Sequence, residues 1–288
     1  MSSFRIVTDS SCDLSSTLAA QLDLVVLPLT LAINGQHYKN YLDGRDIENE
    51  TFYEIMRQNK AAPATSGMNL IEFTMIVESV LKQGQDVLYI GLSSELSGTY
   101  PVGVSAIGKL RLRYPERKIV TVDSRCVSLG QGLLCQLCHR QQMAGATLEE
   151  VRDYAEGIKN KIVHTFMVDD IGVLRRGGRL YAKKEVAGKT LNMKPLLHVD
   201  EKGRLVTFGR ARGRKAAILA IANSVENNIS DVSTMVIGHG GCEADARYLA
   251  QLLSERGVPE VSISEIGPVV GAHSGVGTLA LFYLGKER

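Results

Sequence analysis

The sequence has 288 residues, of which 44% are hydrophobic and 22% charged. This composition excludes a disordered chain, and the length is typical of about two domains. The net charge of +2 excludes a polycation. No apolar run approaches the ~18 residues of a membrane-spanning helix, and the first residues lack the layout of a signal peptide, so we expect a cytoplasmic protein.

Short apolar runs alternate with helical patterns in the first half of the chain. Continuous runs of this kind are typical of strands buried on both faces of a parallel sheet. Asn69 with Glu72, and Thr147 with Glu150, have the spacing of capping boxes at the start of two helices. We therefore predict an N-terminal α/β domain with a four-stranded parallel sheet over residues 1–158. The four strand-like runs are residues 4–7, 24–29, 87–90 and 119–122.

The second half predicts a different sheet. Residues 200–203, Asp-Glu-Lys-Gly, separate two apolar runs and indicate a hairpin. Helical patterns cover residues 215–226 and 243–255. We expect a C-terminal α/β domain with a mixed six-stranded sheet over residues 159–288. The six strand-like runs are residues 166–168, 196–199, 205–208, 235–237, 261–266 and 279–284.

The cysteines do not predict a disulfide framework, because there are five of them and no export signal. Cys135, Cys138 and His139 form a C-x-x-C-H pattern, which is also typical of haem attachment. Leu134 and Leu137 add apolar residues at helical spacing, and no second C-x-x-C completes a zinc site. We interpret the segment as a core helix and predict neither a metal nor a cofactor.

Positive charge is concentrated in the second half. Residues 175–215 hold 13 basic and 3 acidic residues. A basic block can bind nucleic acid, but this one contains only two aromatic residues, Tyr181 and Phe208, and no nucleic-acid-binding motif. A solvated face, or a docking surface for an acidic protein, is the favoured interpretation.

Three hydroxyl-rich loops follow predicted strands of the first half, at residues 8–14, 91–100 and 123–130. Ligands of open α/β sheets bind beyond the carboxyl ends of the strands, where these loops would meet. The segment from Ser97 to Thr99 opens the next predicted helix, so its N–H groups and hydroxyls could bind an anion. Helix capping is the alternative interpretation of each loop.

Further candidate residues come from three other segments. Thr65 and Ser66 form a hydroxyl pair, Arg179 follows two glycines, and His273 lies in a glycine-rich turn. No nucleophile elbow, phosphate-binding loop or H-E-x-x-H motif is present, which favours anion capture over bond cleavage. An acyl hydrolase or transferase, with Ser97 as nucleophile and His273 as base, is the alternative hypothesis.

Taken together and in order, these segments resemble the DegV family of bacterial proteins. The resemblance covers nearly the whole chain and implies two α/β domains that enclose an acyl chain. The family includes the fatty acid-binding subunits of bacterial fatty acid kinase. The matching segments are residues 8–14, 28–29, 41–47, 65–66, 92–100, 123–124, 177–179, 193–195 and 271–275.

The resemblance implies a role for each candidate residue. Thr65 and Ser97 would contact the carboxyl group of a long-chain fatty acid, with His273 near it and Arg179 assisting. Arg212 would belong to a docking site for the kinase. The basic stretch 175–215 would serve as a docking face for an acidic kinase, or for anionic lipid headgroups in a transient contact with a membrane surface. The chain itself would be a carrier and not an enzyme. Ser66, Gly98 and Ser274 complete the expected binding set.

One departure from the family pattern concerns the headgroup loop. The family usually continues the Thr-Ser pair with Gln-Pro, whereas Gly67 and Met68 follow Ser66 here. The hydroxyl pair is kept, but the loop loses the rigidity that proline gives.

Overall fold

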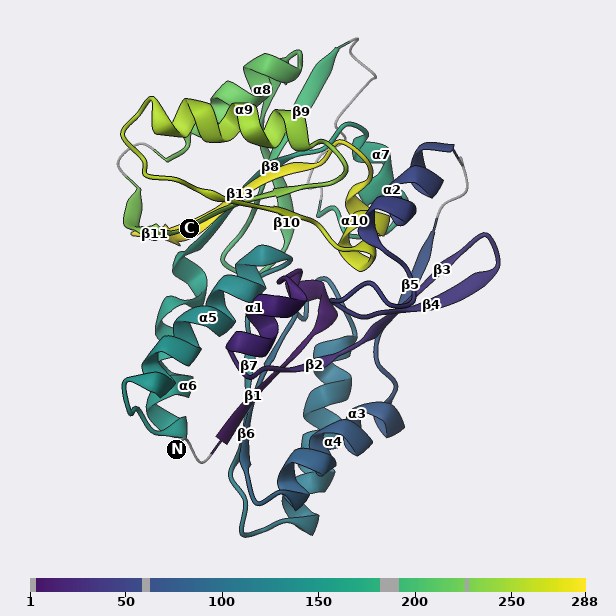
Figure 1. Cartoon of the computed structure of the whole chain (residues 1–288), viewed down its shortest axis with the longest axis vertical. Coiled ribbons are helices and arrows are strands. Elements are labelled where there is room, and N and C mark those ends of the chain that lie inside the picture. Colours follow the sequence, from purple (N-terminus) through teal and green to yellow (C-terminus); the bar gives the residue numbers. More distant parts are fainter. Residues whose placement is uncertain (1–3, 59–62, 182–191, 226–227) are drawn as a thin grey trace.

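A computed structural model describes residues 4–58, 63–181, 192–225 and 228–288 of the chain. The chain folds into two stacked halves, each built on its own large sheet (Figure 1). The first half ends with α6 (Leu148–Ile158) and η2 (Lys159–Lys161), and the second begins with β8 (Ile162–Met167). The domain boundary between residues 158 and 159 stays a prediction.

The predicted four-stranded parallel sheet forms the centre of the first half. Its strands lie in the order β2-β1-β6-β7, and each neighbouring pair is parallel. The strands are β1 (Phe4–Asp9), β2 (Val25–Leu27), β6 (Asp86–Gly91) and β7 (Ile119–Asp123).

Helices cover both faces of this sheet, which explains why its strands are continuous apolar runs. Val7 and Tyr89 pack under α3 and α4, and Ile6 and Leu88 pack under α5 and α6 on the opposite face. Besides α6, the covering helices are α3 (Leu70–Lys82), α4 (Thr99–Arg113) and α5 (Leu129–Met143).

The structure also contains a three-stranded antiparallel sheet, β4-β3-β5, which was not predicted from the sequence. The run 24–29, predicted as one strand, divides at Pro28: β2 ends before it and β3 (Leu29–Ile33) starts the new sheet. Asn34 and Gly35, with φ of 52° and 77°, form the two-residue turn to β4 (Gln36–Asn40). Asn-Gly favours such hairpin turns, so the sequence carried this signal.

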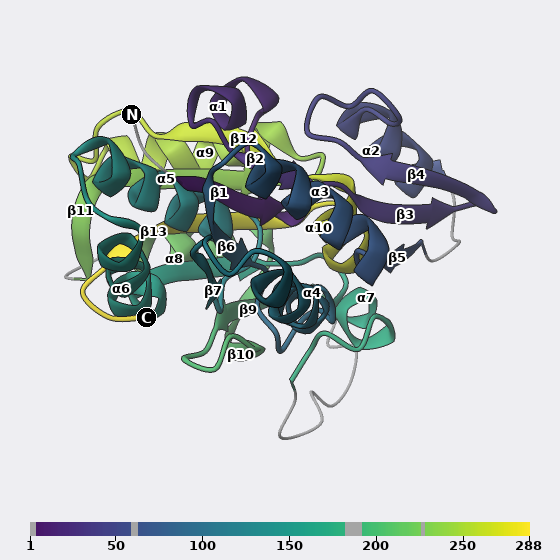
Figure 2. The ribbon, with the colours of Figure 1, turned by 90° about the horizontal axis from the view of Figure 1, so that it is seen from below.

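The small sheet joins the two halves. Its third strand is β5 (Ala64–Ser66), and it lies with α2 (Asn49–Gln58) at one side of the molecule (Figure 2). Tyr53 of α2 donates a hydrogen bond from its hydroxyl to the Ile266 carbonyl at 2.7 Å. Residues of α2 and β3 also pack against Ala272 of α10 (Pro268–Ser274).

The second half contains the predicted mixed six-stranded sheet, in the order β10-β9-β8-β13-β11-β12. Only β11 and β12 pair in parallel among its described strands. The turn at residues 200–203 connects β9 to β10, as predicted. The further strands are β9 (Met193–Val199), β10 (Leu205–Arg212), β11 (Ile229–His239), β12 (Ser262–Glu265) and β13 (Leu279–Gly285).

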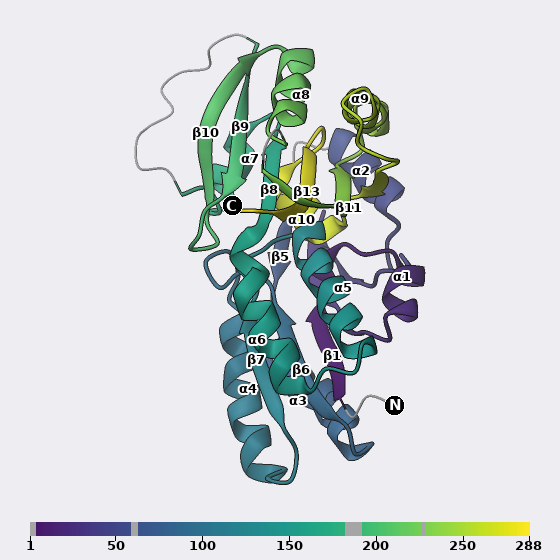
Figure 3. The ribbon, with the colours of Figure 1, turned by 90° about the vertical axis from the view of Figure 1, so that its left-hand side faces the viewer.

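The two faces of this second sheet have different neighbours. Leu279, Leu281 and Tyr283 of β13 pack against α8 (Arg214–Asn223) and α9 (Glu243–Ser254), which lie far from the parallel sheet (Figure 3). The alternate residues Ala280 and Phe282 point toward the first half. The end predicted for the first of these helices, residue 226, lies outside the described residues.

Most predicted helix starts are confirmed. Thr147 and Glu150 form a complete capping box at α6. Asn69 caps α3 by accepting a bond from the Glu72 amide, but the Glu72 carboxylate pairs with Lys39 at 3.0 Å instead of closing the box.

The C-x-x-C-H segment is a core helix, as predicted. Cys135 and Cys138 are buried on α5, and burial raises the pKa of both thiols. Within the described ranges, no group of three or more His, Cys, Asp or Glu side chains could hold a metal, and no helix is long and apolar enough to cross a membrane.

Candidate functional site: a cavity between the two halves

A cavity of about 320 Å³ lies between the carboxyl ends of the parallel strands and the inner face of the second sheet. Its volume is at the lower end of small-molecule sites. The predicted residues Thr65, Ser66, Ser97, Gly98, Arg179, His273 and Ser274 all line it. Segments more than 200 residues apart in the sequence therefore meet at one site.

The first polar contact of the cavity joins Thr65 of β5 to His273 of α10. The Thr65 Oγ1 and His273 Nε2 atoms are 2.6 Å apart. Burial, and then the nearby Arg179 guanidinium, lowers the pKa of His273 to about 4. The imidazole is therefore neutral at pH 7. Gly177 gives it space, because a Cβ at that position would lie 2.8 Å from His273 Nδ1.

Arg179 brings a positive charge to the same end of the cavity. Its Nε donates to the Leu96 carbonyl at 3.1 Å, and its Nη1 donates to the Gly177 carbonyl. Two carbonyls from different segments thus fix the guanidinium plane. Five N–H donors are available in a guanidinium, so donors beyond these two can serve an anion.

The start of α4 lies at the same end of the cavity, and the predicted helix start at residues 97–99 is confirmed. Gly98 is its N-cap residue, and the Thr99 amide donates to Ser97 Oγ at 3.2 Å. Ser97 Oγ also donates to Thr99 Oγ1 at 3.0 Å. The first amides of a helix favour a negative charge close by. A carboxylate at this end of the cavity would therefore meet a helix N-terminus as well as Arg179.

Ser274 adds a buried hydroxyl. It is 6% exposed and lines the cavity, and its Oγ has no hydrogen-bond partner among the described residues. A buried hydroxyl without a partner is costly, so a polar ligand atom there would be stabilising.

The remainder of the cavity wall is mainly apolar. These side chains come from both sheets and from the helices that connect them. They could accommodate a hydrocarbon chain, because the other polar side chains of the wall, Ser11, Ser128, His164 and Thr278, already bond to neighbouring residues. The apolar side chains are Leu29, Met68, Leu92, Leu96, Val102, Val127, Phe166, Leu174, Leu205, Ile266, Val269, Val270, Ala280 and Phe282.

The hydroxyl-rich loops do converge, but many of their side chains bind one another. Asp9 accepts from the Leu92 amide at 3.2 Å, and Asp13 accepts from Ser128 Oγ at 2.6 Å. Burial raises the pKa of Asp13 to about 8. Ser11 and Ser128 line the cavity, so the 8–14 and 123–130 loops mainly build its wall. The 91–100 loop contributes Ser97 and Gly98 to the polar end.

The arrangement differs from that of the hydrolase hypothesis. His273 bonds to Thr65 and Ser97 bonds to Thr99, so the described residues do not pair Ser97 with His273. Arg212 lies elsewhere: it is exposed, at the end of β10, and it does not line the cavity. Part of the basic block, residues 182–191, lies outside the described residues.

Comparisons with known proteins agree with this architecture. A family model described as "uncharacterised protein, DegV family" matches residues 3–286. A DegV domain-containing protein of Clostridium perfringens is 36% identical over 291 residues, which cover 100% of this chain and 99% of that relative.

Two solved structures are also similar over almost their whole length. One, from Thermus thermophilus, is of a DegV family protein and is described by its fatty acid binding; it has a TM-score of 0.85 and 28% identity, covering 97% of this chain and 98% of that one. The other is DegV of Bacillus subtilis, described as a fatty acid binding protein, with a TM-score of 0.84 and 27% identity, covering 99% and 100%. The chain therefore belongs to the DegV family.

Proposed function

We propose that this chain binds a long-chain fatty acid in the cavity and presents its carboxylate to a separate fatty acid kinase. The observation that carries the proposal is the division of one cavity into an apolar body and a polar end. Fatty acid binding by the Thermus thermophilus and Bacillus subtilis proteins supports it.

The acyl chain would supply most of the affinity. Burial contributes about 0.8 kcal/mol per CH₂, so a 16-carbon chain gains on the order of 10 kcal/mol before the costs of binding. A buried carboxylate is unfavourable unless hydrogen bonds or a cation compensate it. Thr65, Arg179, Ser274 and the start of α4 would provide this compensation and set the orientation of the chain.

Exposure at the polar end supports presentation to a partner. Ser66 and Gly98 line the cavity and are themselves exposed, so the carboxylate would lie near the surface. The exposed Arg212 and Arg210 of β10 would attract an acidic kinase surface. In this proposal the kinase supplies the chemistry of phosphoryl transfer and this chain supplies none.

Native mass spectrometry of the purified protein tests fatty acid binding. We expect a stoichiometric adduct that is released on denaturation and identified as a fatty acid. A protein that stays free of ligand after incubation with a panel of fatty acids would overturn the proposal.

Presentation needs a separate assay. The loaded protein is mixed with a bacterial fatty acid kinase and ATP, and acyl phosphate is trapped with hydroxylamine. We expect the product only when both proteins are present, and less of it with Arg212→Ala. Product from this chain and ATP alone would contradict a carrier role.

A further inference from the structure

The turn from Ser274 to Thr278 follows the helix that carries His273. Thr278 Oγ1 donates to the carbonyls of Ser274 at 3.0 Å and Gly275 at 2.8 Å, so it closes the end of α10. Gly277 has a φ of 82°, which a residue with a side chain rarely adopts. The position of the turn therefore determines where α10 ends and where His273 and Ser274 lie.

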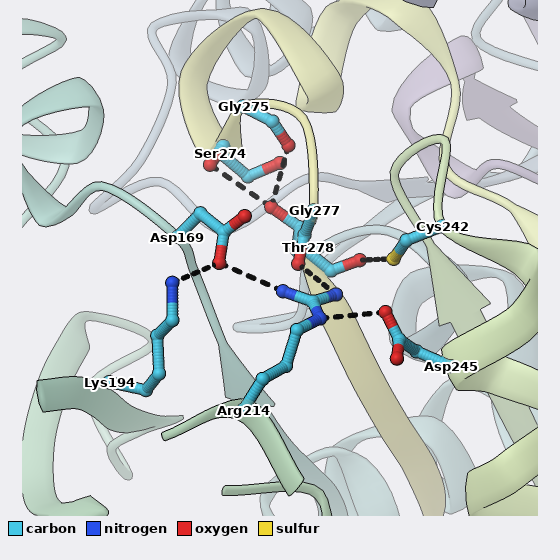
Figure 4. A network of polar contacts seen from close by, with 9 residues as sticks. All are labelled: Asp169, Lys194, Arg214, Cys242, Asp245, Ser274, Gly275, Gly277 and Thr278. Carbon is cyan, nitrogen blue, oxygen red and sulfur yellow. Dashed lines mark hydrogen bonds and ion pairs between the residues drawn. The ribbon is translucent and has the colours of Figure 1, made fainter. Parts of the chain in front are cut away.

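Arg214, the first residue of α8, does not line the cavity but points toward this turn (Figure 4). Its Nη2 donates to the Gly277 carbonyl at 2.9 Å. Its Nη1 pairs with Asp169 Oδ1 at 2.8 Å and its Nε with Asp245 Oδ2 at 2.6 Å. Lys194 of β9 also pairs with Asp169, at 2.5 Å. We call these four charged residues, Asp169, Lys194, Arg214 and Asp245, the Arg214 cluster.

The cluster brings together elements that are distant in the sequence. Asp169 lies just before α7 (Ile171–Arg176), which leads to Gly177 and Arg179, and Asp245 belongs to α9. A Cβ on Gly277 would collide with the Asp169 carboxylate, so Asp169 can approach only because residue 277 is glycine. The Arg214 side chain is 24% exposed, so its ion pairs are partly shielded from solvent.

A second set of bonds holds the turn from the side of β11. The Gly277 amide donates to the Gly240 carbonyl at 2.7 Å, and the Gly240 amide donates to the Thr278 carbonyl at 2.8 Å. These bonds fix one edge of the turn. On the other edge of the turn, Arg214 connects the Gly277 carbonyl to both acidic residues of the cluster, Asp169 and Asp245.

We propose that Arg214 is a positioning residue for the carboxylate site: through the Gly277 carbonyl and Asp169 it holds the turn that places His273 and Ser274. The proposal rests on the proposed function, because it concerns the same polar end of the cavity. It assigns Arg214 no contact with the ligand. Loss of Arg214 should therefore impair recognition of the carboxylate and leave the apolar wall intact.

The test compares Arg214→Met with Arg256→Met in the full-length, delipidated protein. Methionine keeps an apolar stem and removes the charge. Arg256 is the matched control, since it also ties α8 to α9: its Nη2 donates to Asn223 Oδ1 at 2.7 Å, at the opposite end of α8. Each variant is titrated with hexadecanoic acid and with hexadecanol, which has the same chain and no carboxylate.

We expect Arg214→Met to weaken binding of the acid about tenfold, as for the loss of one hydrogen bond to a charged group, and to change binding of the alcohol less than about twofold. Arg256→Met should alter neither by more than about twofold. In ¹⁵N-histidine NMR, Arg214→Met should move the titration of His273 from near pH 4 toward its ordinary range, because a displaced turn admits water to the imidazole.

The outcomes separate this inference from the proposed function. If the wild-type protein binds neither ligand, the proposed function fails. If the wild type binds the acid and Arg214→Met weakens acid and alcohol equally, or neither, the positioning role is refuted. If Arg214→Met does not fold, Asp245→Asn is used instead, because it removes one ion pair of Arg214 and keeps the shape of the side chain. We then expect a smaller loss of affinity for the acid, again with little change for the alcohol.

Discussion

Replacing Ala280 by leucine tests whether the cavity is the acyl site. Ala280 is 3% exposed, lies on the inner face of β13 opposite Phe166, and lines the cavity. Leucine adds three carbon atoms and should displace about three methylene groups of a bound chain. At about 0.8 kcal/mol per CH₂ this is about 2.4 kcal/mol, or about fifty-fold in affinity for a chain that fills the cavity.

The assay is a series of dissociation constants for saturated fatty acids of 10 to 18 carbons, a range that brackets a chain of about 16 carbons. We expect the preferred length to become shorter by about three carbons in Ala280→Leu. An unchanged length profile would refute the assignment of the acyl chain to this cavity.

A matched variant separates cavity filling from overpacking. Ala217 of α8 is fully buried among the side chains that pack on the opposite face of the sheet. Ala217→Leu should lower the free energy of unfolding by about 1–3 kcal/mol, because a packed core has no room for the added atoms. Ala280→Leu should cost the ligand-free protein less than about 1 kcal/mol, because the added atoms enter the cavity. Equal losses in urea unfolding would mean that Ala280 faces no usable space.

Three further predictions concern the same site and its supports. Thr65→Val removes the hydroxyl that bonds to His273 and should weaken fatty acid binding about tenfold, with Thr65→Ser restoring it; equal affinities by fluorescence competition would contradict the role of the hydroxyl. The folded-state pKa of His273, about 4, is below its ordinary value of 6.5, so the unfolded chain takes up the proton first and stability falls as pH decreases from 6.5 toward 4. Urea midpoints at pH 7.5 and 4.5 should therefore differ more in wild type than in His273→Gln, and an equal difference would count against this assignment. Gly130→Ala places a Cβ against His164 and should destabilise the fold by about 1–3 kcal/mol, whereas Gly108→Ala, in open space on α4, should stabilise it by about 0.5–1 kcal/mol; the reverse order in thermal unfolding would contradict the packing.

The large sheets could be predicted from the sequence because their strands follow simple patterns. Runs buried on both faces, such as residues 87–90, indicate a parallel sheet covered by helices. The small sheet was missed although Asn34-Gly35 is a strong hairpin signal. Its strands continue an apolar run that Pro28 divides, and β5 has three residues, so neither length nor periodicity identifies it.

The polar residues of the candidate site could be predicted from the sequence, but its apolar wall could not. Thr65, Ser97 and His273 could be singled out because they lie in segments rich in hydroxyls or glycine, but the role of each near a carboxylate came only from the resemblance to the DegV family. The apolar wall could not be singled out, since Phe166 or Ala280 has the same pattern as any core residue. Whether an inward-facing side chain meets another side chain or an empty space depends on how the two sheets are spaced, and one sequence does not carry that information.

The inner face of the second sheet has a consequence for how a fatty acid enters and leaves. Ala280, Phe282 and Leu205 face the first half of the chain, so a bound acyl chain would become part of the interface between the halves. The loaded protein should then melt at a higher temperature than the empty one, by an amount that rises with ligand concentration. A chain held at this interface would exchange more slowly when the two halves are held together more tightly, so the exchange rate of fatty acid would report on the local stability of the interface.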